Sequence, residues 1–211
     1  MKHLALIIFS VFSLTAYSQS GYEEAMKAGF DSMRNVKSPK DFVACANYFE
    51  RIAQVETTEW LPLYYSAYCK VIRAFASQDI TIKEKMLNSA EPQIEAALKI
   101  GPEEPEMYTL QGMYYQAVIG LDPMNNGQMY SGKSNGALDQ AIRLDKTNPR
   151  PYYLKAMNIM YTPEEFGGGL NAACPLFSKA NELFATYKVK NELYPDWGKE
   201  DCANYCSKCS N

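Results

Sequence analysis

The stretch "LDQAIRLDKTNPRPYYLKAM", residues 138–157, decides the fold because two related stretches precede it in the chain. They are "IEAALKIGPEEPEMYTLQGM", residues 94–113, and "FERIAQVETTEWLPLYYSAY", residues 49–68, and both align with it without a gap. The three copies therefore begin about 45 residues apart. A period of about 20 to 50 residues is typical of stacked supersecondary units. The sequence thus predicts a repeat protein.

Each copy contains the end of one helix and the start of the next. Apolar residues at spacing i, i+3 mark one face of the first of these helices: Phe49 with Ile52, Ile94 with Ala97, and Leu138 with Ala141. A short breaker segment follows, and then a proline falls in or near the first turn of the next helix, where its missing N–H costs no hydrogen bond. These prolines are Pro62, Pro105 and Pro151. Two helices per period are therefore expected.

The spacing of small and large residues resembles that of the tetratricopeptide repeat family, over roughly residues 39–185. In each first helix a large residue is followed by a small one four positions later: Leu63 with Ala67, Tyr108 with Gly112, and Tyr152 with Ala156. In the second helices a small, a large and a small residue follow at spacings four and three: Cys45, Phe49, Ile52; Ala90, Ile94, Ala97; Ser134, Leu138, Ala141; and Ala173, Phe177, Ala180. The resemblance implies an all-α fold, a right-handed α-α superhelix of stacked helical hairpins with about nine helices.

The repeats exceed the usual length of about 34 residues. The alignment places the extra residues between the two helices of each unit, and we expect turn-rich connections there: "FASQDITIKEKMLNS", "GLDPMNNGQMYSGKSN" and "YTPEEFGGGLNA". Glycines 167–169 are expected to form a tight turn, because no phosphate-loop pattern accompanies them. A neighbouring superfamily of helical hairpins is an alternative. Residues 21–35 and 197–209 are expected to form the first and the capping helix.

The first eighteen residues have the layout of a secretory signal peptide, with a positive start, a short apolar run and small residues before Gln19. We therefore expect residues 19–211 to form a single exported domain, periplasmic or extracellular, that is not inserted in the membrane after cleavage. An uncleaved anchor is the alternative interpretation.

Composition excludes several classes of function. The net charge is −3, so the chain lacks the positive field that attracts nucleic acid or an anionic membrane surface. Its only histidine, His3, lies in the predicted signal peptide. Histidine-based nucleophile activation and histidine-ligated zinc are thus not expected in the mature chain. We predict a protein that is not an enzyme and that uses no cofactor and no metal.

Cysteine positions suggest disulfides, which persist in exported proteins. Cys45 and Cys69 flank the turn near residue 57 symmetrically, so antiparallel helices would bring them together. By the same reasoning Cys174 could pair with Cys206 or with Cys209, and the remaining cysteines could pair or stay free. The Cys202, Cys206 and Cys209 spacing also resembles an iron–sulfur motif, but it lies at the end of an exported helical chain. Simple burial as small residues is another alternative.

The concave side of such a superhelix is lined by the first helices, and counting from their anchor residues predicts an aromatic and methionine-rich groove. Such a surface suits an extended peptide or an apolar helix, so a protein or peptide is the expected partner. The alternative is a structural component that assembles an envelope complex through its loops and ends. The predicted groove residues are Tyr64, Tyr68, Val71, Ile72, Thr109, Met113, Gln116, Ala117, Tyr153, Met157, Met160 and Tyr161.

Overall fold

The computed structural model describes residues 21–209, so the predicted signal peptide and its cleavage point lie outside the described residues. Within this range the chain forms α-helices joined by short connections, and it contains no strand. The predicted all-α class is confirmed. Residues 21–34 are helical, and the further elements are α2 (Asp41–Val55), α3 (Leu61–Phe75), α4 (Ile80–Ile100), α5 (Pro105–Ile119), α6 (Pro123–Leu144), α7 (Pro149–Tyr161), the 3-10 helix η1 (Glu164–Phe166), α8 (Leu170–Thr186) and α9 (Lys199–Lys208).

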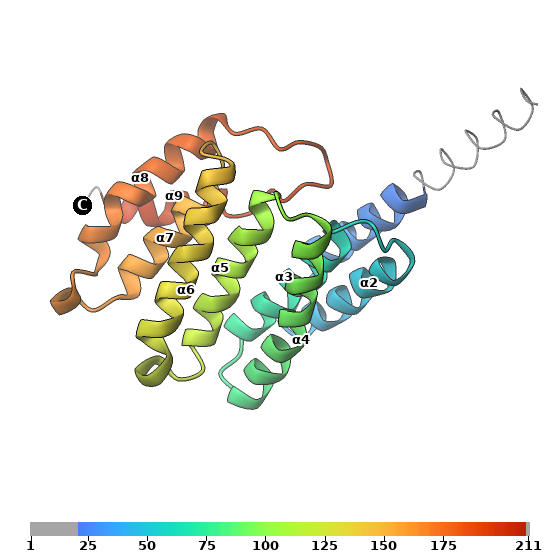
Figure 1. Ribbon diagram of the computed structural model, residues 1–211, viewed down its shortest axis with the longest axis horizontal. Helices are drawn as coiled ribbons and strands as arrows, with labels where there is room; N and C mark the ends of the chain where they lie inside the picture. The colour runs from blue at the N-terminus through green and yellow to red at the C-terminus, as the bar shows by residue number, and fades with distance from the viewer. Residues whose placement is uncertain (1–20, 210–211) are drawn as a thin grey trace, which may run out of the picture.

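The helices follow one another as a row of antiparallel hairpins (Figure 1). Helices α3 and α4, α5 and α6, and α7 and α8 pack as pairs, and α2 packs against α3. The first helices also contact each other directly, α3 with α5 and α5 with α7, and so form one continuous wall. The predicted solenoid of stacked hairpins is confirmed, with each expected first and second helix in its place.

Small residues allow close helix packing where the repeat pattern predicts it. A Cβ atom added to Gly112 would lie 2.6 Å from Cγ and Cδ2 of Leu138, so only glycine fits without a shift of Leu138. The equivalent Ala67 and Ala156 are fully buried. The large residues of the second helices fill the space between neighbouring hairpins and are almost completely buried: Phe49, Ile94, Leu138 and Phe177.

The extra length of the repeats is helical, which corrects the expectation of long turn-rich connections. Most of it extends the N-terminal ends of α4 and α6, which leaves only residues 76–79 and 120–122 as connections. Aspartate side chains start both helices: Asp79 accepts hydrogen bonds from the backbone N–H groups of Thr81 and Ile82, and Asp122 accepts one from that of Asn125. These N-caps satisfy N–H groups that a helix start otherwise leaves unpaired. They therefore favour a helix start at these positions although the sequences that follow are polar.

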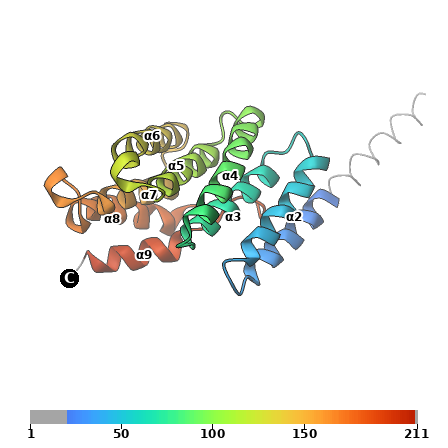
Figure 2. The same cartoon turned by 90° about the horizontal axis from the view of Figure 1, so that it is seen from below.

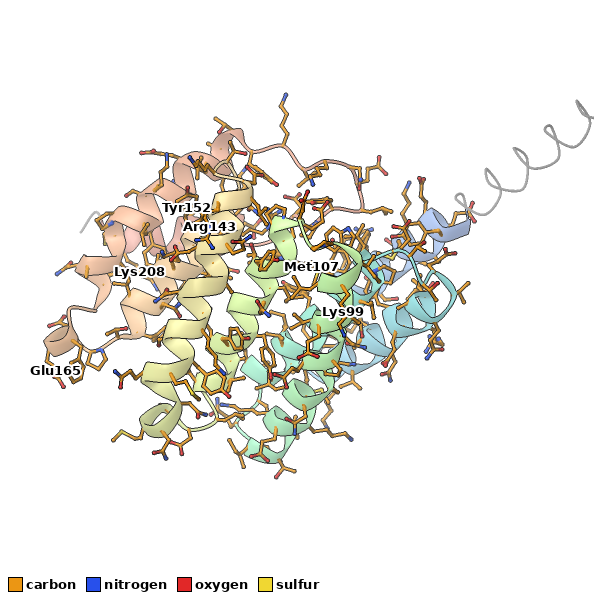
Figure 3. All side chains as sticks on the ribbon, in the orientation of Figure 1. Lys99, Met107, Arg143, Tyr152, Glu165 and Lys208 are labelled. Atoms are coloured by element: carbon orange, nitrogen blue, oxygen red, sulfur yellow. A yellow bond between two sulfur atoms is a disulfide. The ribbon has the colours of Figure 1, made fainter. Side chains whose placement is uncertain are left out.

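The connection between α7 and α8 is a true turn, as predicted. Pro163 follows the end of α7, η1 makes a single turn, and Gly167 and Gly169 adopt φ angles of 81° and 92°. Such left-handed conformations are open to glycine and strained for other residues. Figure 3 shows Glu165 of this turn at the outer edge of the molecule.

The chain after α8 returns along the wall of first helices. Residues 187–198 form a long connection with a turn at 191–194, and α9 then packs on α8. Figure 2 shows α9 in a layer of its own beside α7 and α8. Among the described helices, none combines the length and the apolar character that crossing a membrane requires.

Candidate functional site

The C-terminal segment, residues 188–209, covers much of the predicted groove. The Trp197 indole N–H donates a hydrogen bond of 2.8 Å to the hydroxyl of Tyr64, which is fully buried. The ring centroid of Tyr68 lies 5.6 Å from that of Trp197. In the first repeat, therefore, the groove residues contact the chain's own end.

The groove residues of the second repeat are mostly engaged within the solenoid. Thr109 is fully buried and donates its hydroxyl hydrogen bond to the carbonyl of Pro105. The Gln116 amide donates to the Leu154 carbonyl at 2.7 Å and to the Asn158 side chain at 2.9 Å. This residue thus joins α5 to α7, and Met113 beside it is buried.

The third repeat leaves one end of the wall open. Tyr153 is buried beside Phe177 and Tyr205, with ring centroids 6.2 and 6.4 Å away. Met157 and Met160 are half-buried, whereas Tyr161 is 73% exposed. Ile72, in the first repeat, is also half-buried. As a binding surface the groove stays a prediction, and its accessible part is the end formed by α7.

A buried ionic network ties the wall to the C-terminal segment, and the sequence reasoning missed it. Arg150 and Glu106 are both fully buried, with 3.2 Å between Nη1 and Oε1. Asn148 donates to the same Glu106 carboxylate at 2.7 Å, and Arg150 also donates to the carbonyl of Pro195. Burial raises the pKa of Glu106 to about 7, while Arg150 and Asn148 act in the opposite direction. Glu106 and Arg150 each follow a proline that starts a helix, where a charged residue is usually exposed to solvent. Hydrophobic periodicity therefore gave no indication that this pair is buried.

An open pocket of about 550 Å³ lies between α2, α3 and α4, away from the predicted groove. Val43, Ile82 and Met86 supply apolar lining. The charged residues that line it are four cations and one carboxylate: Lys40, Lys70, Arg73, Lys85 and Glu50. The sequence does hold a signal of this pocket, because Lys70 and Arg73 interrupt the otherwise apolar α3 at spacing i, i+3.

The two α3 cations of the pocket differ in their partners. Lys70 Nζ lies 3.5 Å from the Glu50 carboxylate and donates to the Ser89 carbonyl at 3.3 Å. Burial lowers the pKa of Lys70, and Glu50 opposes that shift. The Arg73 side chain lines the same pocket and is only 7% exposed. No hydrogen bond or ion pair of Arg73 is found within residues 21–209, and none of its nitrogens is among the fully enclosed unpaired atoms, so the guanidinium group reaches the open pocket.

No protein-family model and no curated protein sequence matches the chain. A solved structure, the HusA haemophore from Porphyromonas gingivalis, is 30% identical with a TM-score of 0.79, and the alignment covers 89% of this chain and 92% of HusA. The chain belongs to the HusA family. A thermophilic TPR protein from Thermus thermophilus is 14% identical with a TM-score of 0.57, over 93% of this chain and 94% of that one. This second likeness shows the TPR-like fold alone.

One of the predicted disulfides is present in this HusA family member. Cys174 and Cys209 are bonded, with 5.6 Å between their Cα atoms, so the bridge links α8 to the end of α9. Cys202 is buried and donates to the Phe177 carbonyl, and Cys206 is a free thiol. Because Cys209 is in the bridge, the three terminal cysteines do not act together as an iron–sulfur motif here.

The expected Cys45–Cys69 bridge is not formed, and both residues are buried free thiols. Burial raises the pKa of Cys69, and the neighbouring Cys45 adds to this effect, so the two residues do lie near each other. Symmetry about a turn predicts which helical turns face one another. It does not set the direction of the two side chains, which a disulfide also requires.

Proposed function

We propose that the protein is an exported binding protein that carries a haem-type tetrapyrrole. The observation that carries this proposal is the 30% identity with a haemophore along nearly the whole of both chains. The Cys174–Cys209 bridge supports export, because disulfides persist in oxidising compartments. The predicted signal peptide agrees with it. The same comparison favours a binding function over catalysis.

The composition indicates how such a ligand would be held. The chain has 16 tyrosines and 10 methionines, but its one histidine precedes the predicted cleavage point. Imidazole, a common axial ligand of haem iron, is thus not available in the mature chain. Tyrosine and methionine can also ligate haem iron, so a comparison of haem with an iron-free porphyrin distinguishes recognition of the iron from recognition of the ring and its carboxylates.

Absorbance titration tests this proposal. The protein of residues 19–211 is titrated with haemin and, separately, with protoporphyrin IX, and the same additions to buffer serve as the control. We expect a saturable change of the Soret band for both ligands at low micromolar concentration. No saturable change with either ligand would overturn the proposal. Tight binding of haemin alone would show that the iron, and not the ring, is recognised.

A second proposal is a protein partner at the α7 end of the wall. The exposed Tyr161 beside the half-buried Met157 and Met160 supports it, since tyrosine and methionine are favoured at protein interfaces. Tyr161→Glu in the titration above separates the two functions. If this surface serves a protein, the variant binds porphyrin as the wild type does but no longer captures a partner from the envelope fraction. Assembly through the inter-helix loops has less support, because two of the three loops are short.

A further inference from the structure

We propose that the pocket between α2, α3 and α4 binds an amphipathic carboxylate. Its carboxylate pairs with Arg73, and its apolar part lies on Val43, Ile82 and Met86. If the ligand is a tetrapyrrole, the inference rests on the proposed function above, and the propionates of the ring are the carboxylates. A fatty acid presents the same chemistry.

The state of Arg73 is the main argument for the site. A guanidinium group is always charged and carries five N–H donors. An arginine that is mostly buried is normally paired with an anionic group. Arg73 is only 7% exposed and has no partner within residues 21–209, yet none of its nitrogens is a fully enclosed unpaired atom, so its charged end faces the open pocket. A ligand carboxylate would supply the missing partner, and its two oxygens match the planar donors of arginine.

The other charged residues of the pocket favour a negatively charged ligand over a positively charged one. Glu50, the one carboxylate in the lining, already pairs with Lys70. Lys40 and Lys85 are exposed at the pocket and leave its charge positive. The whole chain has a net charge of −3, so this surface is opposite in sign to the molecule. A local positive field of this kind attracts anions.

The apolar lining and the size of the pocket exclude a small inorganic anion as the best ligand. Most small-molecule sites have volumes of about 300 to 1,000 Å³ and combine apolar walls with a few polar groups. The pocket of about 550 Å³ lies in this range. Met86 is buried at its wall, while Val43 and Ile82 are half-buried. Contact with an apolar ligand would remove these last two side chains further from water.

Four proteins test the site: the wild type, Arg73→Gln, Arg73→Lys, and the control Arg51→Gln. Arg51 is an exposed arginine of α2 outside the pocket lining. Each is titrated with protoporphyrin IX, with its dimethyl ester, which lacks free carboxylates, and with dodecanoate. We expect Arg73→Gln to weaken the binding of the free acids about tenfold or more and to leave the ester unchanged. Arg73→Lys should keep part of the affinity, and Arg51→Gln all of it.

The outcomes separate this inference from the proposed function. Porphyrin binding that is unchanged in Arg73→Gln, or equal for the acid and the ester, overturns the site and leaves the carrier function standing. Arg73-dependent binding of dodecanoate without porphyrin binding supports the site and overturns the carrier function. If no ligand binds the wild type, both fall. Circular dichroism checks folding, and should Arg73→Gln not fold, the ratio of acid to ester affinity in Arg73→Lys decides instead.

Discussion

At the scale of single residues, Gly112 shows how one missing side chain sets the distance between helices. Its added Cβ would lie 2.6 Å from two carbons of Leu138, which is fully buried and has little room to move. Gly136, in α6, has no atom within 4 Å of its added Cβ. Both glycines are helical, so alanine improves helix propensity by about 1 kcal/mol at either position. A difference in unfolding free energy between the two Gly→Ala variants therefore reflects packing around the added methyl group.

We predict that Gly112→Ala lowers the free energy of unfolding, whereas Gly136→Ala raises it by up to about 1 kcal/mol. Overpacking a core typically costs about 1 to 3 kcal/mol, which outweighs the gain in propensity at Gly112. Urea denaturation of the two variants and the wild type measures both effects. Stabilisation by both substitutions would mean that α6 moves away from α5 without cost.

At the scale of elements, α9 depends on its attachments. It is a short helix in which Cys202 is the only buried residue. Isolated helices of this length are marginal in water. Stacking of Tyr205 on Phe177, with ring centroids 5.2 Å apart, and the Cys174–Cys209 bridge hold it on α8. The bridge should therefore contribute a large part of the stability of the C-terminal end.

We predict that the double variant Cys174→Ser, Cys209→Ser loses about 3 to 4 kcal/mol of unfolding free energy, as expected when a bridge closing a loop of this length is removed. The bridged residues are 35 positions apart. The matched control is Cys206→Ser, which removes a free thiol of the same helix. Thermal unfolding under non-reducing conditions gives both values. Equal melting temperatures for the double variant and the control would contradict a stabilising bridge.

At the scale of the whole molecule, the C-terminal segment joins repeats that are distant in the sequence. In a simple solenoid each repeat contacts only its neighbours. Here Tyr65 of α3 donates to the Leu193 carbonyl at 3.0 Å, and Arg150 of α7 donates to that of Pro195. Through Arg150, Glu106 of α5 belongs to the same network. The segment thus links α3, α5 and α7, which belong to three different hairpins.

This network predicts a dependence of stability on pH. The pKa of Glu106 is about 7 in the folded protein, above its ordinary value of 4.5. A raised pKa means that the folded state binds the proton more tightly. The contribution to stability is thus complete below about pH 4.5 and is lost as the pH rises through about 7. The free energy of unfolding, measured by urea denaturation, should fall more between pH 5 and pH 8 for the wild type than for Glu106→Gln.

The exposed neighbour Glu103 provides the control for this measurement, since Glu103→Gln removes a carboxylate without changing the network. The Glu103→Gln variant should lose as much unfolding free energy between pH 5 and pH 8 as the wild type. If Glu106→Gln loses as much unfolding free energy as the wild type, the pKa of Glu106 is not raised. The attraction of Arg150 would then outweigh the effect of burial.

The repeat, the order of its helices and the small residues at their crossings were predictable from the amino-acid sequence. Such features are periodic and depend on residues three or four positions apart, as with Phe49 and Ile52 or Leu138 and Ala141. Cys174–Cys209 was one of two predicted pairings at that end of the chain, because antiparallel neighbours meet symmetrically about a turn. The extended starts of α4 and α6 were missed, since their polar sequences carry little helical periodicity.

The path of the C-terminal segment, the Glu106–Arg150 pair and the pocket around Arg73 emerge only when the hairpins are stacked. Each joins residues from different elements, and only the Lys70 and Arg73 positions of the pocket show as a regular spacing along the chain. Burial of Glu106 and Arg150 depends on residues more than 40 positions away. Local periodicity tells which face of a helix is apolar. Which charged groups end up beneath another segment depends on how those faces pack in three dimensions.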